Sequence, residues 1–268
     1  MTPDPIIPSL PQDLESALVR AEPELGPFKR RILWFPVVPS TNDMAAALAE
    51  RGAEEGCVVI ADAQSAGRGR HGRVWASPPG AGLYVSAILR PSAAAMPLVT
   101  LAAGVALADG IQAASGLSPV LKWPNDVYLG TRKVAGILAE GGVSPAGAHH
   151  VVLGFGINVL PAALPPGISA RATSLEGELG RPVDRGLLLA SCLSALAERY
   201  LDLQAGRGAA VLDAWRARGA SLLGRPVEWD ADGKLARGVA QDIDEAGALL
   251  VRTETGIVRV IAGEVRWT

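Results

Sequence analysis

The residues best suited to chemistry lie in one loop, from Gln64 to Trp75, whose centre alternates glycine with arginine. Three glycines and three arginines occur between Gly67 and Arg73. Glycine lets the backbone approach a ligand closely, and arginine presents a planar fork of N–H donors that suits carboxylates and phosphates. The glycine spacing matches neither a P-loop nor a dinucleotide-binding fingerprint. We therefore predict an anion-binding loop that is mobile when empty, against the alternative of a solvated basic turn.

Further polar residues stand where strands end or helices begin. Ser40, Thr41 and Asn42 precede an alanine-rich helix; one of them is enough for the N-cap, which leaves the others for a ligand. Lys133 opens an otherwise apolar strand, where its ammonium can either snorkel to water or point into a cleft at an anion. The remaining polar candidates flank a Pro-Asn-Asp turn or end a strand: Lys122, Asn125, Asp126 and Asn158.

Glycines in two of the expected strands predict a groove. Gly154 and Gly156 are two residues apart in the strand 150–158, so they share one face, and two missing side chains on that face leave room for a ligand. Gly136 leaves similar room in the strand 133–140. Trp75, which closes the Gly/Arg loop, is either a core anchor or a surface on which an aromatic ring can stack.

The periodicity of the chain predicts the elements that position these residues. Strands are expected at 31–38, 56–63, 83–89, 133–140 and 150–158, and helices at 44–51, 97–115, 183–205 and 209–217. Short strands separated by hairpin turns follow residue 224, which predicts a small antiparallel barrel. We expect an N-terminal arm at 1–30, a main domain at 31–222 and the small domain at 223–268.

Composition limits the class of protein. The chain has 268 residues, a net charge of -2 and a pI near 6.0, with 49% hydrophobic residues. This balance gives no global support for nucleic-acid or membrane binding. Only two cysteines occur, so neither a disulfide framework nor a structural zinc site is expected. No apolar run is expected to approach the ~20 residues of a membrane span, and the N-terminus lacks a signal peptide, so we predict a cytoplasmic protein.

Taken together, the motifs resemble those of the biotin–protein ligases, the biotin–[acetyl-CoA-carboxylase] ligases. The resemblance covers residues ~32–160 in the family's order. It implies an α+β fold with a mixed β-sheet of the biotin/lipoate ligase type, similar to class II synthetases, and an SH3-like barrel at the C-terminus. It also implies the monofunctional class, because residues 1–30 are too short for a winged helix. Four stretches carry it, with Gly154 to Asn158 as a weaker fifth: Ser40-Thr41-Asn42, Gly67 to Arg73 with Trp75, Lys122 to Asp126, and Lys133 with Gly136.

The resemblance implies a two-step reaction, in which biotin and ATP with Mg²⁺ give biotinyl-5′-AMP and a lysine of a biotin carboxyl carrier domain then takes the biotin. Arg68, Arg70 and Lys133 are the expected catalytic cations. Asp126 can hold Mg²⁺ or polarise Lys133, and no resident metal site is expected. The implied biotin site comprises Ser40, Thr41, Asn42, Gln64, Gly67, Arg68, Gly69, Arg70, Lys133, Gly136, Gly154 and Gly156. The implied ATP and adenylate site comprises Arg68, Arg70, Trp75, Lys122, Asn125, Asp126, Lys133 and Asn158.

Two alternatives stay open from the sequence. A lipoate ligase shares the fold and the adenylate chemistry, although the Gly/Arg loop and the Lys-Trp-Pro-Asn-Asp stretch favour biotin. A non-catalytic biotin or nucleotide sensor is disfavoured because it needs no cations at residues 68, 70 and 133. No Ser–His or Cys–His nucleophile is evident, which agrees with transfer through a bound adenylate. We expect a monomer or weak homodimer that binds neither nucleic acid nor membrane.

Overall fold

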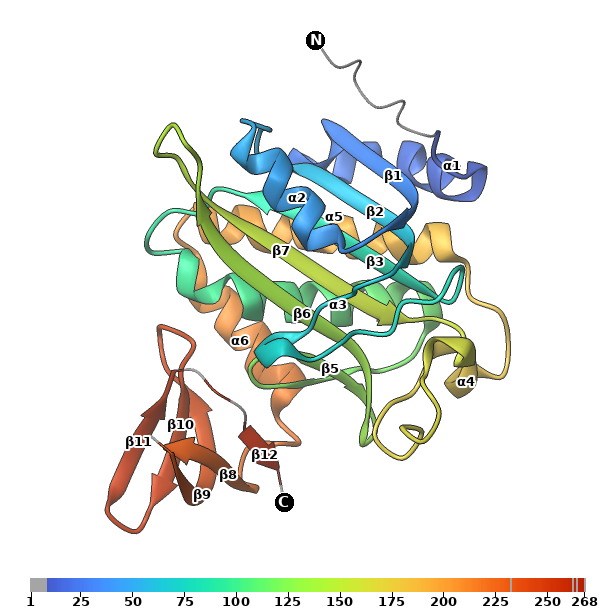
Figure 1. The fold of residues 1–268 in the computed structure, drawn as a ribbon. Coiled ribbons are helices and arrows are strands. Elements are labelled where there is room, and N and C mark those ends of the chain that lie inside the picture. The colour runs from blue at the N-terminus through green and yellow to red at the C-terminus, as the bar shows by residue number, and fades with distance from the viewer. Residues whose placement is uncertain (1–8, 232, 262, 264, 268) are drawn as a thin grey trace.

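A computed structural model describes residues 9–231, 233–261, 263 and 265–267, and its ribbon is shown in Figure 1. A seven-stranded sheet forms the centre, in the order β1-β2-β3-β7-β6-β5-β4. Only β1 and β2 run parallel, and every other neighbouring pair is antiparallel, so the sheet is mixed, as predicted. The strands are β1 (Arg31–Val38), β2 (Cys57–Gln64), β3 (Gly82–Leu89), β4 (Val120–Lys122), β5 (Asp126–Leu129), β6 (Arg132–Val143) and β7 (His149–Asn158).

Helices cover both faces of this sheet. Every residue of β3 is buried, because α2 packs on one face while α3 and α5 lie on the other. Short 3₁₀ turns link the elements at Glu22–Glu24, Gly26–Lys29, Arg70–Gly72, Met96–Leu98 and Pro161–Ala163. The helices are α1 (Gln12–Ala21), α2 (Thr41–Glu50), α3 (Val99–Ser115), α4 (Leu175–Leu179), α5 (Arg185–Gln204) and α6 (Gly208–Gly219).

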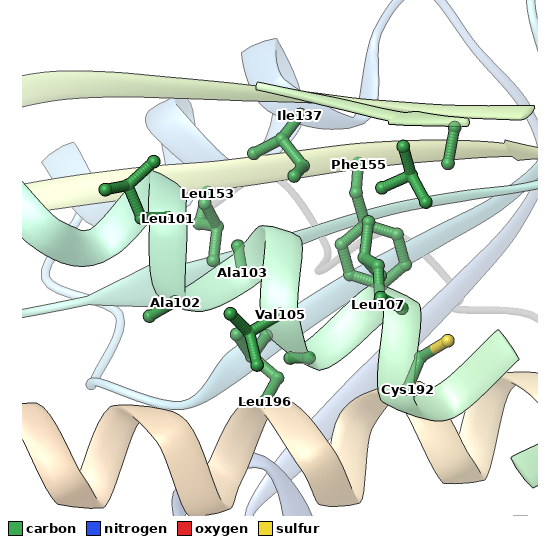
Figure 2. Packing of buried hydrophobic residues seen from close by; sticks show 14 of the residues in the cluster. Leu101, Ala102, Ala103, Val105, Leu107, Ile137, Leu153, Phe155, Cys192 and Leu196 are labelled. Atoms are coloured by element: carbon green, nitrogen blue, oxygen red, sulfur yellow. The ribbon is translucent and has the colours of Figure 1, made fainter. Parts of the chain in front are cut away.

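The core is built around α3, which is mostly apolar because it lies between the sheet and α5. Figure 2 shows Leu101, Val105 and Leu107 of this helix between the strand residues and α5. Gly110 permits the close crossing of the two helices, since an added Cβ would lie 2.6 Å from the Cα of Cys192. A helix that is apolar on most sides is typical of a buried core.

The expectation that no segment approaches membrane-spanning length was wrong. Met96–Ser115 is a 20-residue helical stretch that is long and apolar enough to cross a bilayer. However, 72% of an apolar 18-residue window within that stretch is buried inside the protein, so its composition reflects its place in the core.

The N-terminal segment packs onto the main body. Leu14 and Leu18 of α1 and Phe28 of the second 3₁₀ turn are buried, and α1 contacts α5. The part of the predicted arm at residues 1–8 lies outside the described residues.

The C-terminal segment forms a separate antiparallel sheet in the order β11-β10-β9-β8-β12. It is fixed to the main body, because Trp123 Nε1 donates to the carbonyl of Gly247 (2.9 Å) and Arg216 Nε donates to Asp242 (2.7 Å). The α+β class is therefore confirmed, while the SH3-like character and the boundary near residue 222 stay predictions. The strands are β8 (Pro226–Ala231), β9 (Lys234–Ile243), β10 (Leu249–Thr253), β11 (Gly256–Val260) and β12 (Val265–Trp267).

Candidate active site

The Gly/Arg loop connects β2 to β3 and crosses the face of β6 and β7 on which α2 lies (Figure 1). It folds back on itself, since Gly69 N donates to the carbonyl of Arg73 (2.7 Å) and Trp75 N donates to that of Gly67 (2.9 Å). Gly67 must be a glycine here, because an added Cβ would lie 2.8 Å from Ser77 Oγ. The loop is therefore a turn with internal hydrogen bonds, although nothing apolar anchors its tip.

The polar run before α2 forms a buried hydrogen-bonded array. Ser40 is the N-cap, as predicted, and its Oγ accepts from Asp43 N (3.4 Å). The backbone N–H of Thr41 donates to Gln64 Oε1 (2.8 Å), and the Thr41 hydroxyl lies 3.2 Å from the same oxygen. The chain ends of β1 and β2 therefore bring together three of the predicted biotin ligands: Ser40, Thr41 and Gln64.

The predicted glycine groove exists, and Trp75 lies across it. Gly136 pairs with Gly156 in the register of β6 and β7. The indole packs so closely that a Cβ added to Gly156 would lie 2.6 Å from Trp75 Cε2, and one added to Gly136 would lie 3.0 Å from Cζ3. The remaining cavity at this glycine slot measures about 50 Å³. Pockets for drug-sized ligands are typically about 300–1,000 Å³, so the indole must move for a ligand to enter.

Asn42 lines the slot, and its role as a biotin ligand stays a prediction, while both ends of its amide are engaged by the protein. Its Nδ2 donates to Glu140 Oε2 (2.8 Å) and lies 3.3 Å from the carbonyl of Leu138. Its Oδ1 accepts from Ser86 Oγ (2.6 Å). The residue is buried on the same face of β7 as the slot, directly against Gly154.

Arg68 lines the glycine slot, and its predicted role as a catalytic cation stays a prediction. Its guanidinium lies 2.6 Å from Glu140 and 2.7 Å from Asp43, so two carboxylates already balance its charge. The residue lines the glycine slot, whereas the larger cavity beside it is lined by other cations.

That larger cavity has a volume of about 410 Å³ and is lined by all the predicted ATP-side residues except Arg68, namely Arg70, Trp75, Lys122, Asn125, Asp126, Asn158 and Lys133. It is lined as well by Arg73 and Arg171, which the sequence analysis did not select. Among the described residues, five cations therefore surround one carboxylate, Asp126, which is an environment suited to a polyanion.

Lys133 is held from several directions. Its Nζ lies 2.6 Å from Asp126 Oδ1 and 5.3 Å from the centre of the Trp75 ring, a cation–π contact. Its backbone N–H donates to the carbonyl of Arg171 (2.9 Å), and its carbonyl accepts from Thr173 N (2.8 Å). Its ammonium is therefore fixed where the glycine slot meets the larger cavity, both of which it lines.

The other predicted ATP-side residues are positioned by their neighbours. Asn125 accepts from Arg70 Nη1 (3.1 Å) and donates to the carbonyl of Ile137 (2.8 Å). Asn158 donates to the carbonyl of Thr173 (3.0 Å), which leaves its amide oxygen for other partners. Lys122 Nζ donates to the Tyr128 hydroxyl (3.3 Å). Burial, and secondarily the Asp126 carboxylate, raises the pKa of Tyr128 to about 12, so this phenol stays neutral at ordinary pH.

Comparison with known proteins gives the family. Residues 34–158 match the biotin/lipoate A/B protein ligase family, and residues 222–266 match the biotin protein ligase C-terminal domain. A biotin–[acetyl-CoA-carboxylase] ligase from Paracoccus denitrificans is 37% identical, over 84% of this chain and 96% of that protein. The chain belongs to the biotin protein ligase family.

Two further members of the family are similar to this chain in sequence or in structure. A bifunctional ligase/repressor from Bacillus subtilis is 34% identical, over 88% of this chain and 74% of that protein. The structure of the Aquifex aeolicus biotin protein ligase in complex with biotin and ATP superposes with a TM-score of 0.76, at 30% identity over 89% of this chain and 99% of that one.

Several site residues escaped the sequence analysis of this biotin ligase family member. Glu140 ends an apolar run that reads as an ordinary strand, and Arg171 lies in a proline-rich loop. Neither belongs to a motif. Glu140 reaches the site through the pairing of β6 with β7, and Arg171 reaches it through the bridge between Lys133 and Ala172. Ser86 is buried in the apolar strand β3. Its lone hydroxyl within an apolar run was the sequence signal that could have indicated a site residue.

Proposed function

We propose that this protein is a biotin–protein ligase that activates biotin as biotinyl-5′-AMP and transfers it to a lysine of a biotin carboxyl carrier domain. One observation carries the proposal: the narrow glycine slot and the larger cation-lined cavity adjoin each other. A slot floored by glycines suits a thin apolar acyl chain, and five cations around a cavity suit a polyphosphate. Both spaces are lined by the same five residues: Gly69, Arg70, Trp75, Asn125 and Lys133.

In the first step, a carboxylate oxygen of biotin attacks the α-phosphorus of ATP, and the bond from that phosphorus to the bridging oxygen of pyrophosphate breaks. Two anions must approach each other, so cations at the meeting point lower the barrier. We assign this role to Lys133, which stands between the two spaces, and to Arg70. The hydroxyls of Ser40 and Thr41 and the amide of Gln64 then hold the ureido ring of biotin at the far end of the slot.

Magnesium fits the site only in partnership with the substrate. Among the described residues, no group of three or more His, Cys, Asp or Glu side chains is placed to hold a metal ion. Mg²⁺ in ATP-using sites is commonly bound by one or two carboxylates together with the phosphates and water. Asp126 is the carboxylate that lines the larger cavity. It would be the protein ligand, and the metal would neutralise phosphate charge.

In the second step, the lysine amine of the carrier attacks the acyl carbon of the adenylate, the bond to the phosphate oxygen breaks, AMP leaves, and the amine loses a proton. We assign no covalent protein intermediate, because the activated acyl group is already on the phosphate. Trp75 and the Gly/Arg loop would shield the anhydride from water until the carrier arrives.

The test is a two-stage assay. Pyrophosphate release is measured with ATP and either biotin or lipoate, and a streptavidin blot then follows transfer to a carrier domain. Biotin-dependent release followed by labelling of the carrier is expected. Pyrophosphate release with lipoate but not with biotin would identify a lipoate ligase. Biotin binding without pyrophosphate release would identify a sensor. Either result refutes the proposal.

The wider setting is proposed on the same basis. The carrier is a domain of a biotin-dependent carboxylase, as the names of the related ligases suggest. We propose a cytoplasmic enzyme that is a monomer or weak homodimer and binds neither a DNA operator nor a membrane. Size-exclusion chromatography at two concentrations, and retardation of DNA fragments at physiological salt, would test these statements.

A further inference from the structure

We propose that Glu140 is a positioning residue that fastens the Gly/Arg loop to the biotin end of the site. The inference rests on the proposed function and deepens it. Glu140 lies on β6, 72 residues from Arg68 in the chain. A single carboxylate oxygen, Oε2, accepts from Arg68 Nη2 (2.6 Å) and from Asn42 Nδ2 (2.8 Å). It therefore joins the loop to the start of α2.

From Asn42 the hydrogen bonds continue to the predicted ligands of the biotin ring. The amide oxygen of Asn42 accepts from Ser86 Oγ (2.6 Å), and Ser86 Oγ lies 2.8 Å from Thr41 Oγ1. Thr41 donates to Gln64 Oε1 through its backbone N–H (2.8 Å). Ser86, Asn42 and Thr41 are all buried, so these bonds form in a setting of low dielectric, where they are strong.

The same network returns to the loop at its other end. Gln64 Nε2 donates to Ser77 Oγ (2.8 Å), and Ser77 Oγ donates to the carbonyl of Trp75 (3.1 Å). The network therefore begins at Arg68 and ends at Trp75, the two residues that bracket the tip of the loop. We call it the polar ring, defined by Arg68, Glu140, Asn42, Ser86, Thr41, Gln64, Ser77 and the carbonyl of Trp75.

Two roles follow from this geometry. Arg68 fastens the loop, acting as its latch, because its guanidinium forms ion pairs with Glu140 and Asp43. Glu140 couples that latch to the groups that recognise biotin, so a ligand that orders Thr41 and Gln64 also orders the loop over the acyl chain. Among the contacts that the structure describes, the shared oxygen makes Glu140 the link between Arg68 and the buried part of the polar ring.

Asp43 offers a matched control. It lies 2.7 Å from the same Arg68 nitrogen, yet its carboxylate makes no hydrogen bond to another member of the polar ring among the contacts that the structure describes. If Glu140 acted only as a counter-charge for Arg68, replacing either carboxylate would have the same effect. If it acts through the polar ring, only the replacement of Glu140 changes the recognition of biotin.

The experiment uses trypsin and steady-state kinetics on the full chain. Arg68, Arg70 and Arg73 make the loop a trypsin target, so the cleavage rate there reports loop opening without requiring activity. Glu140→Ala should be cleaved about five to ten times faster than wild type and should raise the biotin KM by a similar factor, since partly exposed charge-assisted bonds are worth roughly a factor of five each. Glu140→Gln, whose amide oxygen can still accept both bonds, should stay within about two- to three-fold of wild type.

Asp43→Ala can loosen the latch but should leave the biotin KM within about two-fold of wild type. Equal effects of Glu140→Ala and Asp43→Ala on the biotin KM would overturn the inference, and so would an unchanged cleavage rate in Glu140→Ala. Glu140 is partly exposed, so the variant should remain folded. If wild type forms no adenylate, the proposed function fails, whereas the trypsin comparison still tests the polar ring.

Discussion

Replacing the two glycines of β7 with alanine separates the fit of the slot from the stability of the fold. In Gly154→Ala, the new Cβ would lie 2.8 Å from Asn42 Cγ and closer still to its Oδ1. Asn42 is buried and bonded on both sides, so it cannot retreat. Overpacking costs about 1–3 kcal/mol and a lost buried hydrogen bond about 1 kcal/mol more. The melting temperature should therefore fall by roughly 5–10 °C.

Gly156→Ala should behave differently because its neighbour can yield. The new Cβ would lie 2.6 Å from Trp75 Cε2, at the end of a surface loop. Within the described part of the chain, Trp75 Nε1 has no hydrogen-bond partner, so the indole loses none when it turns away. The melting temperature of Gly156→Ala should fall by less than about 3 °C. A methyl group would still occupy the slot, so the biotin KM should rise about ten-fold or more in both variants, given about 1–3 kcal/mol for overpacking.

Gly141→Ala on β6 is the control, because a Cβ there meets nothing within 4 Å. It should match wild type in melting temperature and in biotin KM, measured by differential scanning fluorimetry and by pyrophosphate release. A wild-type biotin KM in Gly156→Ala would refute the assignment of the slot to biotin. Equal losses of melting temperature in Gly154→Ala and Gly156→Ala would refute the view that Trp75 yields while Asn42 does not.

Three further predictions concern the larger cavity. Lys133→Ala should slow biotin-dependent pyrophosphate release by about two decades or more while the protein remains folded, as expected for the loss of a preorganised cation; a wild-type rate would make Lys133 a surface residue. Arg70→Gly removes the bond to Asn125 and should release adenylate roughly ten times faster, given about 1.5 kcal/mol or more for a charge-assisted bond. A streptavidin blot should then show labelling of an unrelated lysine-rich protein, and no such labelling despite adenylate formation contradicts the retaining role. Because the pKa of Tyr128 is raised to about 12, above its unfolded value of about 10, its contribution to stability is complete below pH 10 and is lost as the pH rises to 12. The melting temperature of wild type should therefore fall relative to that of Tyr128→Phe across that window, and a constant difference between the two contradicts the shift.

Local patterns predicted the helices and strands well, because the residues that begin and end such an element lie next to it in the chain. The apolar run with turn residues on either side placed β1 at Arg31–Val38, and the consecutive N-cap residues indicated a helix at 44–51, which in the structure begins three residues earlier, at Thr41. Gly116 was predicted as the C-cap of α3, and its φ of 79° is the left-handed conformation that favours glycine. In each case the deciding chemistry lies within a few residues of the element's end.

Pairings across the sheet could not be predicted in the same way. The sequence indicated that Arg68 carries charge, but a carboxylate 72 residues away decides where that charge is used. Trp75 was expected to be an anchor or a stacking surface, and only the register that places Gly136 opposite Gly156 explains why it fits the groove. Such contacts depend on the strand order, which the spacing of motifs does not encode.

The cations that line both spaces differ in what holds them, and this difference predicts a division of labour. Lys133 stands on β6, with its backbone N–H and carbonyl both bonded to the segment 171–173 and its ammonium paired with Asp126. A charge fixed in this way needs no reorganisation as negative charge develops, which is the condition under which electrostatic stabilisation lowers a barrier. Arg70 stands in the Gly/Arg loop, whose tip has no apolar anchor, so its position follows the conformation of that loop. Substitutions at Lys133 should therefore act mainly on the rate of adenylate formation, whereas those at Arg70 should act mainly on how long the adenylate is retained.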